Sequence, residues 1–166
     1  MTDRSDFDDL SARPGYLIRR LHQIHVGMFL EECAEHNLTP LQYAVLTVLR
    51  GDQALDQVTI ANQIGVDRNT AADVIRRLEK NGLLERPASE QDKRAKLARI
   101  TPAGHEVVRK MQPQMIKAQK RLVKPLTDEE YRVLMNLMDK IVTVNNEASR
   151  APLRRGPRRG RAGREG

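Results

Sequence analysis

The chain has 166 residues, of which 39% are hydrophobic, 31% are charged and only 3% are aromatic, and its formal net charge is +7. This length suits one domain, and the few aromatic residues argue against a large aromatic-lined cavity unless aliphatic side chains build most of it. The single cysteine, Cys33, excludes an intrachain disulfide and favours a reducing compartment. Because no apolar run is long enough to cross a bilayer and no signal-peptide pattern opens the chain, we expect a cytoplasmic protein.

The positive charge is concentrated at the C-terminal end. Residues 149–166 hold seven arginines and one glutamate, so the rest of the chain is nearly neutral. This Gly/Pro/Arg-rich segment predicts a disordered tail, and residues 1–13 predict a flexible N-terminus. The tail is either a solvated segment or a non-specific phosphate-binding arm, and both interpretations stay open.

Two helices are predicted first. The range 14–35 begins with Pro14, which suits a first helical turn, and its apolar residues recur every three or four positions to form one buried stripe (Leu17, Leu21, Ile24 and Met28). A second helix is predicted to run to about 51. Its start is marked by a capping box of Thr39 and Gln42, with Pro40 between them.

Residues 56–86 carry the pattern of a helix-turn-helix. Asp56 can cap a short helix that ends near Ile64, and Gly65 can supply a turn with positive φ. Asp67 can cap a second helix, which Gly82 ends in the left-handed conformation. We therefore expect two helices at the angle that places the second one against DNA.

A β-hairpin and two long helices are predicted after it. Residues 83–86 and 95–100 are short strand candidates flanking a polar loop, and together they predict a wing. A helix starting at Pro102 keeps an apolar seam (Val108, Met111, Met115, Ala118 and Leu122), and Pro113 is expected to kink or loosen it. The last helix, from Thr127 to about 148, carries a second seam (Tyr131, Leu134, Met135, Met138, Ile141 and Val142).

These terminal seams are wider than one small winged domain can cover. A second copy of the chain is the obvious partner, so we expect a two-fold homodimer. In this interpretation 14–50 and 102–148 are dimerisation helices and 51–101 is the DNA-binding lobe. The predicted fold class is mainly α with a small β-hairpin wing, a winged helix-turn-helix.

In this order of elements, the residues from about 14 to 145 resemble the MarR family of bacterial regulators. The Asp-x-Arg of Asp92 and Arg94, followed by Thr-Pro-Ala-Gly from Thr101, is typical of that family. The stretch from Arg13 to Arg20 is similar to members that sense aromatic acids or their coenzyme A thioesters. The resemblance implies a repressor that a small anionic aromatic ligand, or its acyl-CoA thioester, releases from a palindromic operator.

The recognition helix and the wing supply the expected contacts to double-stranded DNA. Side chains from the N-terminal half of such a helix read the major groove, and arginines further along meet phosphates. The resemblance implies that Arg94, oriented by Asp92, enters the minor groove. Because opposite charges lie nearby, an ion pair on a solvated face is the competing interpretation for Arg76 and Arg77. The candidate residues are Arg68, Asn69, Thr70, Asp73, Arg76, Arg77, Asp92, Lys93, Arg94 and Lys96.

The first helix predicts a ligand site. Ile18, His22, His25 and Phe29 share one helical face, with two arginines beside it, and cations and imidazoles are groups that bind a carboxylate. The candidate ligand residues are Arg19, Arg20, His22, His25, Phe29 and, on the second helix, Tyr43. The competing interpretation is that the histidines are core or interface groups and the arginines are solvated.

Other functions are less well supported by the sequence. A redox sensor would use Cys33, but Glu31 and Glu32 disfavour its thiolate. A metal sensor would draw on His22, His25, Glu32, Cys33 and His36. Glu32 and His36 share a helical face, but His25 and Glu32 are two turns apart, about 10 Å along the helix, which is too far for one ion unless another chain helps. An architectural DNA-binding protein is compatible with the basic tail. No enzymatic motif and no cofactor motif is present, so we expect neither catalysis nor a cofactor.

Overall fold

The computed structural model describes residues 8–51, 53–87, 97–149 and 151–152. Its helices are α1 (Pro14–Glu32), α2 (Pro40–Val48), α3 (Gln57–Ile64), α4 (Arg68–Lys80), α5 (Pro102–Val123) and α6 (Asp128–Val144). Its strands are β1 (Leu55–Asp56), β2 (Leu84–Glu85) and β3 (Leu97–Ile100). Short 3-10 helices lie at Leu10–Ala12, Ala34–His36, Leu49–Gly51 and Asn146–Ala148. The predicted mainly helical winged fold is confirmed.

The strands form one small antiparallel sheet in the order β1-β3-β2. Leu84 lies opposite Ile100, which is the predicted hairpin pairing, and Leu55 lies opposite Ala98 on the other side of β3. The sequence pattern did not predict β1, because two residues are too few for a strand signal. This strand ties the start of α3 to the base of the wing.

The helix starts follow the predicted caps. Thr39 and Thr127 form capping boxes with Gln42 and Glu130, and in each box the Thr side chain accepts from the third backbone N–H of the helix. Gly65 and Gly82 take positive φ values of 70° and 71°, a conformation that glycine adopts without strain. The last turn of the predicted first helix instead forms the 3-10 helix Ala34–His36.

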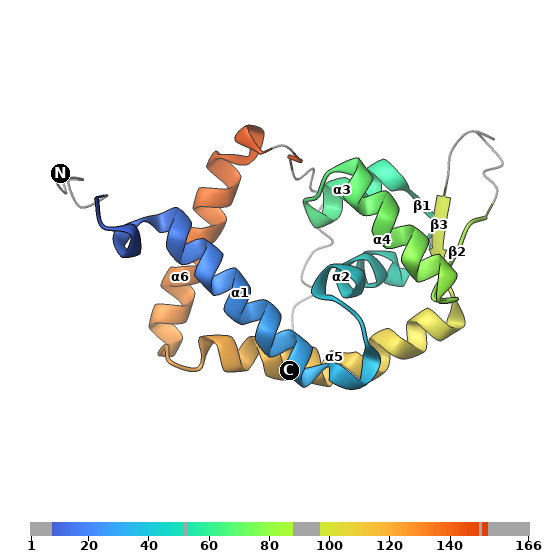
Figure 1. Cartoon of the computed structure of the whole chain (residues 1–166), viewed down its shortest axis with the longest axis horizontal. Helices are drawn as coiled ribbons and strands as arrows, with labels where there is room; N and C mark the ends of the chain where they lie inside the picture. Colours follow the sequence, from blue (N-terminus) through green and yellow to red (C-terminus); the bar gives the residue numbers. More distant parts are fainter. Residues whose placement is uncertain (1–7, 52, 88–96, 150, 153–166) are drawn as a thin grey trace, which may run out of the picture.

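The core joins α1, α2 and α5 to the winged lobe. α1 and α5 lie along one another, and the lobe from α2 to β3 sits at one end of α5 while α6 sits at the other (Figure 1). The largest side chains with almost no exposed surface come from each of these parts (Phe29, Leu46, Ile60, Ile75, Leu78 and Met111). The core therefore fixes α4 relative to the long helices.

Two predictions about the long helices are met only in part by the single chain. The stripe of Leu17, Leu21 and Ile24 is 41–49% exposed there, because α1 turns Phe29 toward the core, so the predicted burial of the stripe depends on a second copy. Pro113 does not end α5, which continues through it as one helix. Pro113 is on the exposed side of α5, where water can satisfy the carbonyl that proline leaves without an N–H partner.

Candidate DNA-binding surface and ligand pocket

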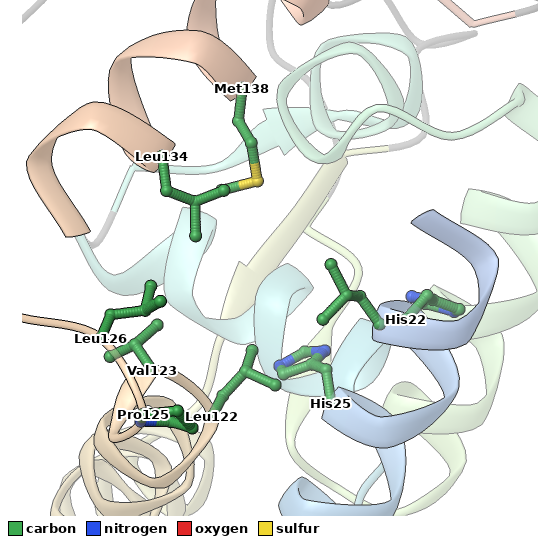
Figure 2. Close-up of a pocket in the computed structure, with 9 residues that line it drawn as sticks. His22, His25, Leu122, Val123, Pro125, Leu126, Leu134 and Met138 are labelled. Atoms are coloured by element: carbon green, nitrogen blue, oxygen red, sulfur yellow. The ribbon is translucent and has the colours of Figure 1, made fainter. Parts of the chain in front are cut away.

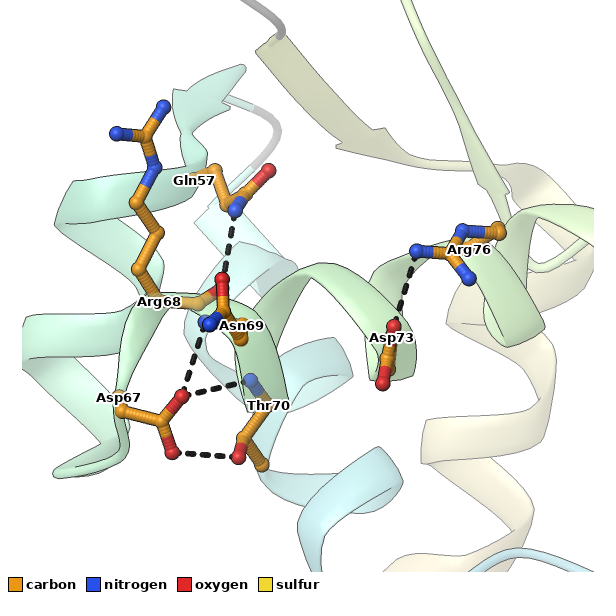
Figure 3. Close-up of polar contacts among 7 residues, drawn as sticks. All are labelled: Gln57, Asp67, Arg68, Asn69, Thr70, Asp73 and Arg76. Carbon is orange, nitrogen blue, oxygen red and sulfur yellow. Dashed lines mark hydrogen bonds and ion pairs between the residues drawn. The ribbon is translucent and has the colours of Figure 1, made fainter.

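The N-terminus of α4 is held by a compact set of polar contacts. The carboxylate of Asp67 accepts from the backbone N–H groups of Asn69 and Thr70, both at 3.0 Å, and from the Thr70 hydroxyl at 2.6 Å. The Gln57 amide of α3 donates to the Arg68 carbonyl at 3.0 Å, so the two helices are linked directly (Figure 3). These contacts lower the pKa of Asp67, chiefly through the Thr70 hydroxyl, and keep it ionised.

The outward face of α4 carries the candidate reading residues. Arg68, Asn69, Asp73, Arg76 and Arg77 are exposed, whereas Ala71, Ile75 and Leu78 are buried on the opposite side. Thr70 is half-buried and bonded to the cap, so it is less accessible than its neighbours. In Figure 3 the Arg68 side chain extends away from the body of α4. The arrangement is a cationic, solvent-facing helix of the kind that enters a major groove.

One ion pair lies in the middle of that face. Arg76 donates to the Asp73 carboxylate at 2.9 Å, and the two side chains are 70% and 60% exposed. Its presence matches the competing interpretation for Arg76, but such an exposed pair is weak and can exchange for a phosphate. Within the described part of the chain, Arg77 forms no such ion pair.

The predicted wing-tip residues Asp92, Lys93, Arg94 and Lys96 lie outside the described residues. The base of the wing is described, and each of its strand ends carries an ion pair. Arg86 donates to Glu79 of α4 at 3.2 Å, and Arg99 of β3 pairs with Glu85 of β2 at 3.5 Å. The first of these contacts links the recognition helix to the wing.

A cavity of about 480 Å³ lies between α1, α5 and α6. Figure 2 shows Leu134 and Met138 of α6 across the cavity from Leu122 and Val123 at the end of α5 and from Leu126 of the turn that follows, with His25 on the α1 side. The complete lining is Leu21, His22, His25, Leu122, Val123, Pro125, Leu126, Leu134 and Met138. The two histidines, both predicted ligand residues, are its polar side chains, but only the His25 ring faces the leucines, whereas the His22 ring turns away from them (Figure 2).

His25 is held at the junction of α1 and α5. Its Nε2 lies 2.9 Å from Nε2 of Gln119, so the Gln119 amide donates to this ring nitrogen when it is unprotonated. Burial, and secondarily the neighbouring His22, lowers the pKa of His25 below its usual value near 6.5. The imidazole is therefore neutral near pH 7, with Nδ1 as its donor.

The other candidate ligand residues lie around this cavity but do not line it. The rings of Phe29 and Tyr43 are 6.0 Å apart in the core beside His25, and burial raises the pKa of the Tyr43 phenol. Arg19 and Arg20 are exposed. The guanidinium of Arg19 lies over the Tyr16 ring at 5.4 Å, and Arg20 donates to Gln23 at 3.4 Å.

The structure also places the residues of the alternative sensors. Cys33 is buried, and burial together with Glu32 raises the pKa of its thiol, which disfavours the reactive thiolate. Glu32 is engaged by Lys117 at 2.7 Å and by Arg121 at 3.2 Å. Among the described residues, no three His, Cys, Asp or Glu side chains are grouped so that they could hold a metal ion.

Sequence reasoning did not single out two sets of residues at these candidate sites. One is Gln57, whose contact with Arg68 depends on how the two helices meet. The other is the apolar wall at the α5–α6 turn, formed by Leu122, Val123 and Leu126. Its signal in the sequence is the meeting of two apolar seams at Pro125, and these seams by themselves predict a dimer surface.

The fold and the exposed cationic helix define a winged helix-turn-helix DNA-binding protein. A family model described as the MarR family matches residues 38–96. The chain belongs to the MarR family of DNA-binding transcriptional regulators. Within the described part of the chain, none of the helices combines the length and apolar character that a membrane span requires.

Three solved structures show how close the similarity is. The PcaV transcriptional regulator of Streptomyces coelicolor, in complex with its natural ligand, is 35% identical, with a TM-score of 0.75 over 81% of this chain and 95% of that one. BpsR of Bordetella bronchiseptica, whose DNA binding is regulated by 6-hydroxynicotinic acid, is 29% identical, with a TM-score of 0.76 over 80% and 95%. A mutant MarR of E. coli complexed with operator DNA is 25% identical, with a TM-score of 0.75 over 83% and 99%.

Proposed function

We propose that this protein is a cytoplasmic, homodimeric repressor that a small aromatic acid releases from a palindromic operator. The observation that carries the proposal is the apolar cavity with His22 and His25 at its α1 wall, on the same chain as an exposed, cationic recognition helix. Both activities are binding events, so the proposal includes no catalytic step. It is supported by relatives that bind operator DNA and by one that responds to 6-hydroxynicotinic acid.

Operator binding is assigned to α4 and to the loop that follows β2. Arg68 and Asn69 stand at the exposed N-terminal end of α4, where side chains reach base edges. Arg76 and Arg77, further along, suit phosphates, and Asp92, Lys93, Arg94 and Lys96 are proposed to act from the wing. A two-fold dimer places two such helices about 34–36 Å apart, one turn of DNA.

The lining of the cavity favours the free acid over its coenzyme A thioester. Leucine, valine, proline and methionine side chains suit an aromatic ring, and the His25 imidazole can donate to one carboxylate or hydroxyl group. The described lining contains no Lys or Arg, whereas the phosphates of coenzyme A require cations. Arg19 and Arg20 are proposed to attract the anion from the surface of α1.

The same residues connect the cavity to the proposed dimer surface. Leu21 and Met138 line the cavity and also belong to the exposed seams of α1 and α6. A ligand that packs against them changes the surface on which the second copy rests, and therefore the spacing of the two recognition helices. To empty an operator, the ligand must favour the non-binding arrangement by a few kcal/mol, about 5 kcal/mol for a complete reversal of populations.

The proposal is tested by fluorescence anisotropy on labelled DNA from upstream of the protein's own gene, at fixed salt and with random DNA as competitor. A panel of aromatic carboxylic acids and their coenzyme A thioesters is titrated into the complex. We expect competitor-resistant binding that one free acid releases. Arg68→Ala should weaken operator binding by about 5- to 150-fold, the value of one good base contact.

The matched variant His25→Ala tests the ligand cavity separately from the DNA-binding surface. It should bind the operator as the wild type does and require more acid for release. If random DNA competes equally and every compound leaves the complex intact, the sensor function is wrong. If only thioesters release the DNA, the ligand class proposed here is wrong and the operator function stands.

A further inference from the structure

We propose that Asp73 is a specificity-determining residue. It lowers the affinity of α4 for random DNA and makes binding depend on the base at one position in each half-site, because it holds the Arg76 side chain unless a base engages its carboxylate. The inference rests on the proposed operator function of α4, and it assigns a role to the exposed carboxylate of Asp73 in the middle of that helix. Arg76 and Asp73 are 2.9 Å apart, one helical turn from each other.

The position of the carboxylate makes it unusual. On the outward face of α4, Asp73 follows Asn69 by four residues, so both side chains lie on one helical row. Arg76 and Arg77 follow it by three and four residues, one helical turn further along. A helix whose only task was to attract phosphates would gain nothing from an acidic group there, because the carboxylate repels the backbone that the arginines attract.

The ion pair gives the carboxylate two states on DNA. Where a base presents an amino group, as cytosine does in the major groove, Asp73 can accept from it and release Arg76 to a phosphate. Where no donor meets it, Asp73 keeps Arg76 and remains a negative charge in the groove. Since both side chains are more than half exposed, the pair itself is weak and can open. Binding is therefore penalised at sites that lack the donor.

The second carboxylate of α4 provides a matched control. Glu79 also lies on the exposed side, but it is held by Arg86 at the base of the wing rather than by Arg76. Replacing Glu79 by Gln removes the same charge from the same helix, leaves the central pair intact and keeps a side-chain oxygen that can accept from Arg86. A charge effect alone would appear in both variants.

The test uses the full-length chain and a randomised duplex library, from which the wild type selects its preferred sites. Binding of Asp73→Asn, Glu79→Gln, Arg76→Ala and the double variant Asp73→Asn/Arg76→Ala is then measured on the selected site, on single-base variants of it and on random DNA, at several salt concentrations.

We expect Asp73→Asn to bind random DNA more tightly, with a salt dependence steeper by about one phosphate contact. Its discrimination at one base position per half-site should fall about fivefold or more. The double variant should lose the gain on random DNA, and Glu79→Gln should keep the wild-type base preference.

Unchanged base preference in Asp73→Asn overturns the inference, and so do equal effects of Asp73→Asn and Glu79→Gln on random DNA. A wild type that selects no site above random DNA contradicts the operator function instead, so the two failures are distinguishable. Circular dichroism shows whether Asp73→Asn is folded. If the double variant, which carries the same substitution, folds and binds DNA, replacing Asp73 does not by itself unfold the chain.

Discussion

His25 combines partial burial with a position on the wall of the cavity. Burial lowers the pKa of its imidazole in the free protein, and His22 adds to this effect. A carboxylate bound beside the ring stabilises the protonated form and so raises this pKa in the complex. Between the two pKa values, binding of the acid takes up a proton, so affinity for the acid should rise as the pH falls through the ordinary histidine range of about 6.5 and below.

Calorimetric titration of one aromatic acid at several pH values, in buffers of different ionisation heat, measures both the affinity and the proton uptake. The variant His25→Gln should bind with little pH dependence, because glutamine does not titrate. The neutral amide of the same acid is the ligand control, since it gains nothing from a protonated ring. A pH dependence shared by acid and amide would assign the titration to another group.

At the scale of elements, the start of α5 is pressed against the wing. A methyl group added at Gly104 would overlap the Leu83 carbonyl oxygen and lie 2.7 Å from Cγ1 of Ile100. Thr101 closes the same corner, because its hydroxyl donates to the Gly82 carbonyl at 2.7 Å and accepts from the Gly104 N–H at 3.1 Å. Neither the strand nor the capped turn can move aside alone.

We therefore expect Gly104→Ala to lower the free energy of unfolding by about 1–3 kcal/mol, the usual cost of overpacking. Urea denaturation followed by circular dichroism measures it. Gly15→Ala is the control, because nothing lies within 4 Å of a methyl group added there in α1, and it should be neutral or slightly stabilising. Equal effects of the two substitutions would show that space at Gly104 is not limiting.

Local signals predicted the elements better than they predicted the cavity. Helix starts were predicted correctly at Asp56, Asp67 and Thr127, because a helix cap involves only residues within one turn. The outward face of α4 followed from helical periodicity in the same way. The wall formed by Leu122, Val123 and Leu126 depends on how α6 folds back after Pro125, and spacing along one helix carries no such information. Tyr43 shows the same limit, since its ring packs into the core against Phe29.

At the scale of the whole molecule, α6 has an apolar face that the single chain leaves open. Tyr131, Met135, Met138, Ile141 and Val142 are 39–56% exposed, although they fall on one side of the helix. The stripe of Leu17, Leu21 and Ile24 on α1 is open as well, at the same end of the molecule (Figure 1). Exposed apolar patches of this kind mark interaction sites, and in the proposed dimer a second copy would bring an identical patch to cover them.

The dimer is tested by placing a charge in this surface. Ile141→Glu should convert the protein to a monomer in size-exclusion chromatography with light scattering, because a carboxylate buried between apolar helices has no partner. Operator affinity should fall with it, since the two recognition helices are then no longer held at a fixed separation. Thr143→Glu adds the same charge on the polar side of α6, and this variant should remain dimeric and bind as the wild type does. If Ile141→Glu also stays dimeric, the apolar face of α6 is not the interface, and the proposed link from the cavity to the recognition helices loses its route through Met138.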